Sequence, residues 1–168
     1  LITNVDVPAV PDLPSGIDPL PARGDDPILS IPQNLTGRLG QTITLPVQLE
    51  VTEASGITIS GMDVAISYDS TQFTVGNVRV GSLLTDNDLS PFSPFANTAT
   101  PGQILVTASS SLGTSNLAQS TSGDVFLIDF TVLPTATGGA SAINLLANSS
   151  GLITGIADND LSDLVLSP

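Results

Sequence analysis

The sequence contains no cysteine, histidine, lysine or tryptophan in its 168 residues. Without Cys, no disulfide, iron–sulfur cluster or thiolate zinc site can form. Without His, Cys or Lys, the commonest general base and the strongest nucleophile are missing, and nothing can activate a serine. The two Glu residues, Glu50 and Glu53, fall on the polar side of a predicted strand and in a polar loop, which does not suggest a glycosidase carboxylate pair. These absences predict a protein that is not an enzyme.

Positive charge is almost as scarce. The only cations are Arg23, Arg38 and Arg79, and with 16 acidic residues the formal net charge is −13. A nucleic-acid site needs a basic stripe, and binding to anionic lipid needs a polybasic cluster. No apolar run approaches the length of a membrane span. We therefore expect no nucleic-acid partner and no membrane insertion. The absence of Lys also excludes isopeptide crosslinks, so any polymer of this chain must be non-covalent.

Short, β-rich segments dominate what is present. Charged residues make up only 11% of the chain, and Gly, Ser, Thr and aliphatic residues fill the difference, a composition typical of secreted β proteins. The chain also begins at Leu1 rather than Met, which suggests either a processed mature protein or an excised piece. We expect a location outside the cell, either secreted or on the cell surface.

A two-residue hydrophobic period begins near Ile28 and predicts strands with one buried face. It is clearest on the apolar side of residues 42–51, which carries Ile43, Leu45, Val47, Leu49 and Val51. Pro46 on the polar side predicts a sheet edge or a bulge. The period recurs over residues 61–69, 102–109 and 123–134, and shorter strands are expected near 28–31, 73–80, 142–147, 151–156 and 163–167.

Glycine and proline turn signals separate these segments, and at most one helical turn is expected, near residues 115–119. The pattern predicts an all-β fold, a jelly-roll β-sandwich of eight to nine strands with an extended N-terminal arm.

Four segments in order resemble blocks of cohesin domains, over about residues 28–167. They are "GRLGQTITLPVQL", "ISGMDVAISYDSTQFTVGNVRVGSLL", "GDVFLIDFTV" and "GLITGIADNDLSDLVL". The resemblance implies a nine-stranded, typically extracellular jelly roll that binds dockerin domains and has no catalytic activity. Cohesins present polar residues from the strand before a Tyr-Asp corner, commonly an Asn two positions ahead of an Asp. Asp63 matches that Asp, whereas Gly61 stands at the Asn position. Asp63 and Tyr68 are therefore candidate partner-binding residues.

The pentapeptide "DNDLS" occurs twice, from Asp86 and from Asp158. An EF-hand calcium loop needs Gly at its sixth position and Glu at its twelfth. The sixth residues are Pro91 and Asp163, so neither copy is an EF-hand. Two interpretations remain: a looser oxygen cage for calcium built from Asp158, Asp160 and Asp163, or Asp- and Asn-rich turns between strands. Apart from this possible calcium, the sequence predicts no cofactor.

The N-terminal arm, residues 1–27, precedes the sandwich domain of residues 28–168. Its repeated prolines predict an extended, polyproline-like chain. A solvated linker would not need the aliphatic residues that are interleaved with them, which begin with Ile2, Val5, Val7, Val10 and Leu13. The arm is expected to lie either on its own sandwich or on a neighbouring copy, where strand addition is an established mode of recognition.

Three hypotheses for function follow. The first is a structural subunit that self-assembles into a surface or extracellular fibre through its arm, with copies of itself as partners. The alternative is a scaffold-type cohesin module that binds a dockerin-like partner. A carbohydrate-binding domain is the weaker third hypothesis. Tyr68 is the sole Tyr and Trp is absent, so the aromatic platform that usually stacks on sugars is hard to assemble.

Asn34 and Asn148 begin N-glycosylation triplets and are candidates for modification.

Overall fold

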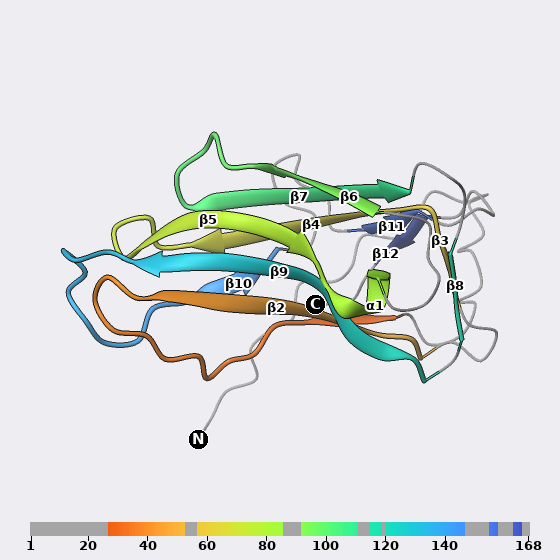
Figure 1. Cartoon of the computed structure of the whole chain (residues 1–168), viewed down its shortest axis with the longest axis horizontal. Helices are drawn as coiled ribbons and strands as arrows, with labels where there is room; N and C mark the ends of the chain where they lie inside the picture. Colours follow the sequence, from red (N-terminus) through yellow and green to blue (C-terminus); the bar gives the residue numbers. More distant parts are fainter. Residues whose placement is uncertain are drawn as a thin grey trace, which may run out of the picture.

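Two antiparallel sheets pack face to face in the computed structural model of this chain (Figure 1). The structure describes residues 27–52, 57–85, 92–110, 115–118, 120–146, 155–157 and 163–165. Nearly all of the predicted N-terminal arm, residues 1–26, lies outside these ranges, so its boundary with the sandwich stays a prediction.

The first sheet has the strand order β1-β2-β9-β5. Its strands are β1 (Ile28–Ser30), β2 (Thr42–Glu50), β9 (Ser122–Val132) and β5 (Phe73–Val80). The second sheet has the order β12-β11-β4-β7-β6, and β10 also pairs with β4. Its strands are β12 (Asp163–Val165), β11 (Gly155–Ala157), β4 (Gly61–Tyr68), β7 (Gln103–Ser110), β6 (Phe92–Asn97) and β10 (Ile143–Leu145).

A further pair, β3 (Ile57–Ile59) with β8 (Ser115–Leu117), and one helical turn, α1 (Ser82–Thr85), complete the described elements. The predicted all-β sandwich is confirmed, and each of the nine predicted strands has a counterpart. Strands β3, β6 and β8 were not predicted. The helical turn expected near residues 115–119 was wrong, because that segment forms β8 and pairs with β3.

The core lies between the two sheets and consists of the apolar sides of the alternating strands. Leu45, Val47 and Leu49 of β2 are buried, as the two-residue period predicted. They meet the buried sides of β4, β7 and β9, which contribute Met62, Val64, Ile66, Ile104, Val106, Ala108, Phe126, Ile128 and Phe130. Apolar area removed from water, at roughly 25 cal/mol per Å², holds the layers together.

Pro46 lies where the prediction of an edge or bulge placed it. Strand β1 pairs only with the last three residues of β2, from Gln48 to Glu50, so the β2 edge beside Pro46 has no β1 partner. The register between β2 and β9 shifts directly after Val47, where Val125 becomes the extra residue of β9. The missing N–H of Pro46 therefore does not interrupt a ladder on the open side.

Gly81 allows the chain to turn from β5 into α1 against the back of β9. Its N–H donates to the carbonyl of Val125 at 2.8 Å, and a Cβ at this position would overlap the backbone carbonyl of Asp124. The close approach also places Leu83 and Leu84 of α1 in the core. A side chain at position 81 would push this turn away from β9.

We expect Gly81→Ala to lower the free energy of unfolding by about 3 kcal/mol, the upper part of the usual range for overpacking. Urea unfolding followed by circular dichroism measures this change. Gly76→Ala is the matched control, because a Cβ there meets Asp129 at an ordinary 3.5 Å. Equal midpoints for the two variants would contradict the proposed close approach.

Candidate partner-binding surface

One broad sheet surface is formed by the outward side chains of β4, β7 and β6, here called the β4–β7–β6 face. Because β4 pairs with β7 and β7 pairs with β6, outward residues line up across the three strands. The face carries Asp63, Ser67, Ser93, Phe95, Asn97, Gln103, Leu105, Thr107 and Ser109. Strand β4 has eight residues, so the face is about 24 Å long at ~3.4 Å per residue.

Phe95 is the most exposed large apolar side chain of the described residues, with 70% of its surface accessible. It lies in one cross-strand row with Thr107 of β7 and Asp63 of β4. Adjacent strands are ~4.8 Å apart, so this row is about 10 Å wide, close to the diameter of an α-helix. Phe95 belongs to β6, the edge strand of this sheet, and an exposed aromatic ring surrounded by polar side chains is typical of binding hot spots.

Asp63 places a carboxylate in the same row. Its Oδ1 atom is buried and, among the described residues, has no hydrogen-bond partner. A buried acceptor without a donor lowers the stability of the folded state by roughly 1–3 kcal/mol. An Asp at this position therefore needs a reason other than stability. A partner could donate to this oxygen only after the atoms that cover it move, because Oδ1 itself has almost no accessible surface.

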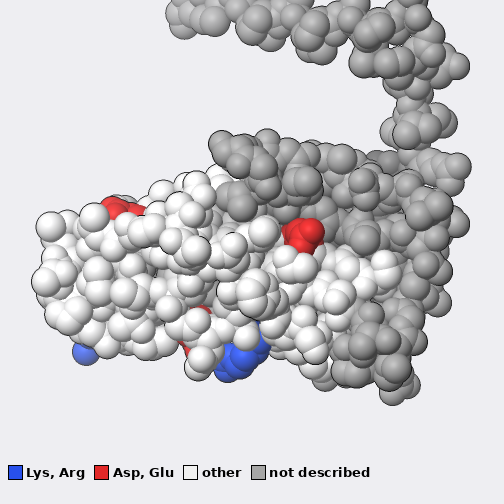
Figure 2. All heavy atoms as spheres, turned by 90° about the horizontal axis from the view of Figure 1, so that it is seen from above, with Lys and Arg blue, Asp and Glu red and all other residues white. Residues whose placement is uncertain are grey.

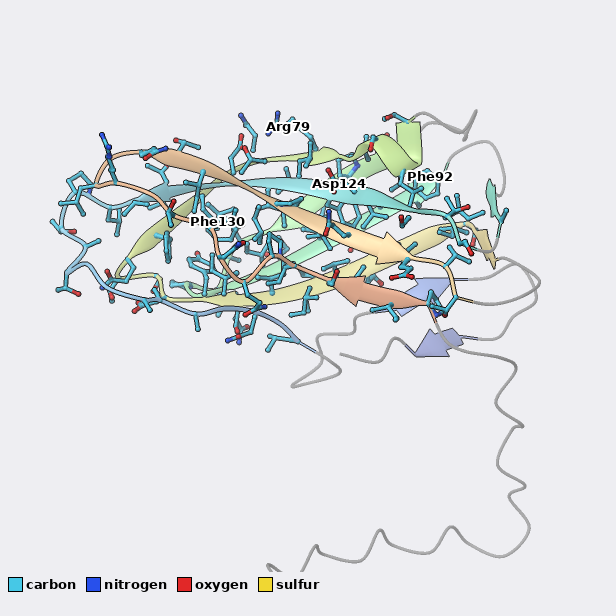
Figure 3. The ribbon with its side chains drawn as sticks, turned by 90° about the horizontal axis from the view of Figure 1, so that it is seen from below. Arg79, Phe92, Asp124 and Phe130 are labelled. Carbon is cyan, nitrogen blue, oxygen red and sulfur yellow. The ribbon has the colours of Figure 1, made fainter. Side chains whose placement is uncertain are left out.

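The outer face of the other sheet differs, because its polar side chains bond to one another. Asp129 accepts from Thr44 at 2.8 Å and forms an ion pair with Arg79 at 2.7 Å. Two more pairs extend this pattern along β2 and β9: Thr42 with Thr131 at 2.9 Å, and Gln48 with Asp124 at 3.1 Å. Figure 3 shows Arg79 pointing outward from β5 and Phe130 between the sheets. These polar side chains already bond to one another, so a partner would have to break these bonds before forming its own.

The β4–β7–β6 face has little charge. Asp63 is its only charged residue, and the described cations, Arg38 and Arg79, belong to the β1–β2 connection and β5. Figure 2 views the molecule from the side on which β6 and β7 lie uppermost in Figure 1, and shows a largely uncharged described surface with isolated acidic and basic patches. A partner therefore meets a neutral face with one negative group.

The structure separates the two partner-binding candidates that the sequence analysis grouped. Asp63 faces outward on β4, whereas the ring of Tyr68 contacts Phe130 edge-on across the core, with centroids 5.5 Å apart. The two residues are five positions apart, so they lie on opposite faces of a strand. Phe95, which sequence reasoning missed, is the residue that shares a row with Asp63.

The remaining candidates have few described contacts. Asp158, Asp160 and Asn148 lie outside the described residues, as do Ile2, Val5, Val7, Val10 and Leu13 of the N-terminal arm. Asp163 begins β12, where its backbone pairs with Ala157. Within the described residues, no group of three or more acidic, His or Cys side chains could hold a metal. Asn34 is exposed on the segment before β2.

Among the described helices, none is long and apolar enough to span a membrane.

The chain belongs to the cohesin-domain family. The family model matches residues 29–163, which include both sheets and the whole β4–β7–β6 face. The resemblance on which the sequence analysis rested is thus confirmed. No curated protein matches the chain.

Solved structures agree with the family match. CaCohA2 from Clostridium acetobutylicum is 28% identical with a TM-score of 0.61, and the match covers 84% of this chain and 84% of that module. The same module in complex with a dockerin is also 28% identical with a TM-score of 0.61, covering 82% of this chain and 90% of that one. A type I cohesin–dockerin complex of OlpA from Clostridium thermocellum is 25% identical with a TM-score of 0.62, covering 84% and 93%.

The Tyr-Asp corner that ends β4 has a specific electrostatic feature. Asp69 Oδ1 accepts hydrogen bonds from the hydroxyl of Thr71 at 2.6 Å and from its backbone N–H at 2.8 Å. These two donors, the hydroxyl first, lower the pKa of Asp69 below its ordinary value of 3.8. The folded state thus favours the ionised carboxylate, and its contribution to stability is present above pH 3.8 and is lost as pH falls through the lowered pKa.

We expect Thr71→Val to raise the pKa of Asp69 toward 3.8, because the hydroxyl donor is lost and the N–H donor remains. A carboxyl-carbon NMR titration measures the midpoint. Thr74→Val, an exposed change on β5, serves as the control and should leave the midpoint unchanged. An identical midpoint in wild type and Thr71→Val would contradict the assignment.

Proposed function

We propose that this cohesin module binds a dockerin-like protein partner through the β4–β7–β6 face and performs no catalysis. The observation that carries the proposal is the row Asp63–Thr107–Phe95, which joins a carboxylate whose Oδ1 has no hydrogen-bond partner among the described residues to an exposed aromatic ring. Two related structures of 28% and 25% identity were solved as cohesin–dockerin complexes, which supports the same class of partner here. The alternative that the sequence left open is thus better supported than self-assembly.

The face suggests how such a partner is recognised. A donor group would bond to Asp63 while apolar side chains cover Phe95 and Leu105, and the surrounding Ser and Thr hydroxyls adapt to polar neighbours. Central aromatic anchors surrounded by weaker polar contacts carry most of the energy at protein interfaces. Gly61 offers no side chain at the position where cohesins commonly have Asn, so we assign more of the recognition to Phe95.

The proposed setting is extracellular. The low content of charged residues and the cohesin fold support a secreted or surface-attached module, and the exposed Asn34 stays a candidate for glycosylation there. No step of this proposal needs a metal bound to the cohesin itself.

Phe95→Ala should weaken dockerin binding by about 30-fold, equivalent to ~2 kcal/mol for an aromatic hot spot. The full chain can be titrated calorimetrically with the calcium-loaded dockerins from the two Clostridium complexes. Stability should change little, since the ring is exposed. Thr44→Ala on the opposite sheet is the control and should bind like wild type. If no dockerin binds the wild type, or if both variants bind equally, this assignment is wrong.

Asp63→Ala should separate binding from folding. Removing the carboxylate whose Oδ1 has no partner among the described residues should leave the free energy of unfolding equal or raise it by about 1 kcal/mol, while binding to the same dockerin falls at least about tenfold. Urea unfolding and calorimetry on one preparation provide both values. A variant that is clearly less stable than wild type would show that Asp63 has a structural role instead.

A further inference from the structure

A second surface, unrelated to the β4–β7–β6 face, lies at the end of the first sheet. A groove of about 670 Å³ has a floor formed by Ile43 of β2, Phe73 of β5 and Val132 of β9. One wall is the segment of residues 33–39 before β2, and the other is the segment of residues 136–141 after β9. The floor residues are adjacent because β2 begins, β9 ends and β5 begins at the same end of the sheet.

Hydrogen bonds hold both walls in place. Gln72 beside the floor forms an amide clip with Thr137, donating to its hydroxyl and accepting from its N–H, both at 3.1 Å. On the other wall, Arg38 N–H donates to Gln41 Oε1 at 3.0 Å, and Gly40 N–H donates to the carbonyl of Val132 at 2.9 Å. The groove therefore does not depend on a ligand for its shape, which is common among binding sites.

The wall before β2 exposes apolar side chains that a stable surface would normally cover. Leu39 is 59% exposed and Leu35 is 41% exposed, and both line the groove. Arg38 lies between these positions in the wall and is one of the chain's three cations. An occupant of this groove should offer aliphatic side chains together with negative charge.

The chain itself contains such an occupant. Residues 1–26 carry aliphatic side chains at Ile2, Val5, Val7, Val10 and Leu13, and five Asp against one Arg. Repeated prolines favour an extended polyproline-like conformation, and proline-rich segments bind grooves lined by apolar and aromatic side chains. Composition and charge thus match the groove.

Strand direction favours a neighbouring molecule over the same one. Ile28 pairs with Glu50 at the end of β2, and β1 then runs toward the groove end. The chain therefore enters β1 at the end of the sheet that lies away from the groove. The nine residues of β2 separate the two ends by about 27 Å. To reach its own groove, a proline-stiffened arm would have to reverse direction and return along the body.

We propose that residues 1–26 of one copy occupy the groove of a second copy, with the aliphatic side chains of the arm against Leu35, Leu39 and Phe73 and its carboxylates near Arg38. The contact is head-to-tail, since the chain enters β1 at the end of the first sheet opposite the groove, and a contact of this kind generates open chains. It uses neither Asp63 nor Phe95.

Sedimentation velocity of the full chain should show oligomers that grow with concentration. Leu39→Asp should raise the concentration of half-association at least about tenfold, because it places a charge in the apolar contact and repels the arm. Phe95→Ala should leave association unchanged and loses only dockerin binding, so failures of the two proposals are distinguishable. A wild-type chain that stays monomeric up to about 1 mM would overturn the inference.

Crosslinking distinguishes a neighbouring copy from the same chain, and the absence of native Cys makes each introduced thiol unique. Full-length chains with Leu39→Cys and one Cys in place of Ile2, Val5, Val7, Val10 or Leu13 are treated with a short bis-maleimide. A ladder of oligomers supports the proposal. A crosslinked monomer would show that the arm docks on its own chain. No crosslink at any of the five positions would show that the arm is an undocked linker. Either result overturns the proposal. Ser93→Cys, on the other sheet, replaces Leu39→Cys as the control.

Discussion

The aromatic contact at Phe130 connects the parts of this structure on which both proposed surfaces depend. Tyr68 from β4 and Phe73 from β5 both meet its ring edge-on, with centroids 5.5 and 6.0 Å away. Tyr68 ends the strand that presents Asp63, and Phe73 forms part of the groove floor. Edge-to-face pairs contribute about 0.5–1.5 kcal/mol each beyond their buried area. One buried side chain thus fixes β4 against the first sheet and the end of β5 against β9.

The two outer faces show how a sandwich can reserve one surface for binding. In both sheets the side chains along each strand point alternately into the shared core and out to the outer face. Burial alone therefore does not distinguish the two outer faces. On the first sheet, Thr44, Arg79 and Asp129 satisfy one another, and a partner would have to break these bonds before forming its own. On the second sheet, Asp63 Oδ1 has no donor among the described residues and the ring of Phe95 is 70% exposed. A partner that bound this face would break few existing bonds.

Sequence reasoning succeeded where one face of a strand is buried and the strand is long. The alternation of Leu45, Val47 and Leu49 could be recognised because core packing and sequence period agree in β2. Strand β6 was missed for a physical reason: its inward side carries Phe92, Pro94 and Ala96 and its outward side Ser93, Phe95 and Asn97, so hydrophobicity does not alternate. β3 and β8 have three residues each, too few for any period.

The candidate site could be predicted only in part. Asp63 stays a prediction that rests on a family pattern, and the structure places it on the opposite face of β4 from Tyr68. The row of Phe95 with Thr107 and Asp63 could be found only from strand pairing, since it joins three strands that are separate in sequence. A signal was present in the polar residues Ser93 and Asn97 at two positions either side, which suggest that the ring between them faces solvent. The groove had no sequence signal, because its walls are loops brought together at a sheet end.

Charge determines how the two surfaces can operate in one molecule. Copies with a formal net charge of −13 repel one another, so contacts between copies must outweigh this electrostatic repulsion. Salt weakens the repulsion, because the Debye length is about 8 Å at physiological ionic strength. The β4–β7–β6 face avoids most of this cost, because it is neutral except at Asp63. The groove offsets it locally by placing Arg38 where an acidic arm would lie. The few cations of this chain therefore constrain its self-contacts more than its contacts with a different partner.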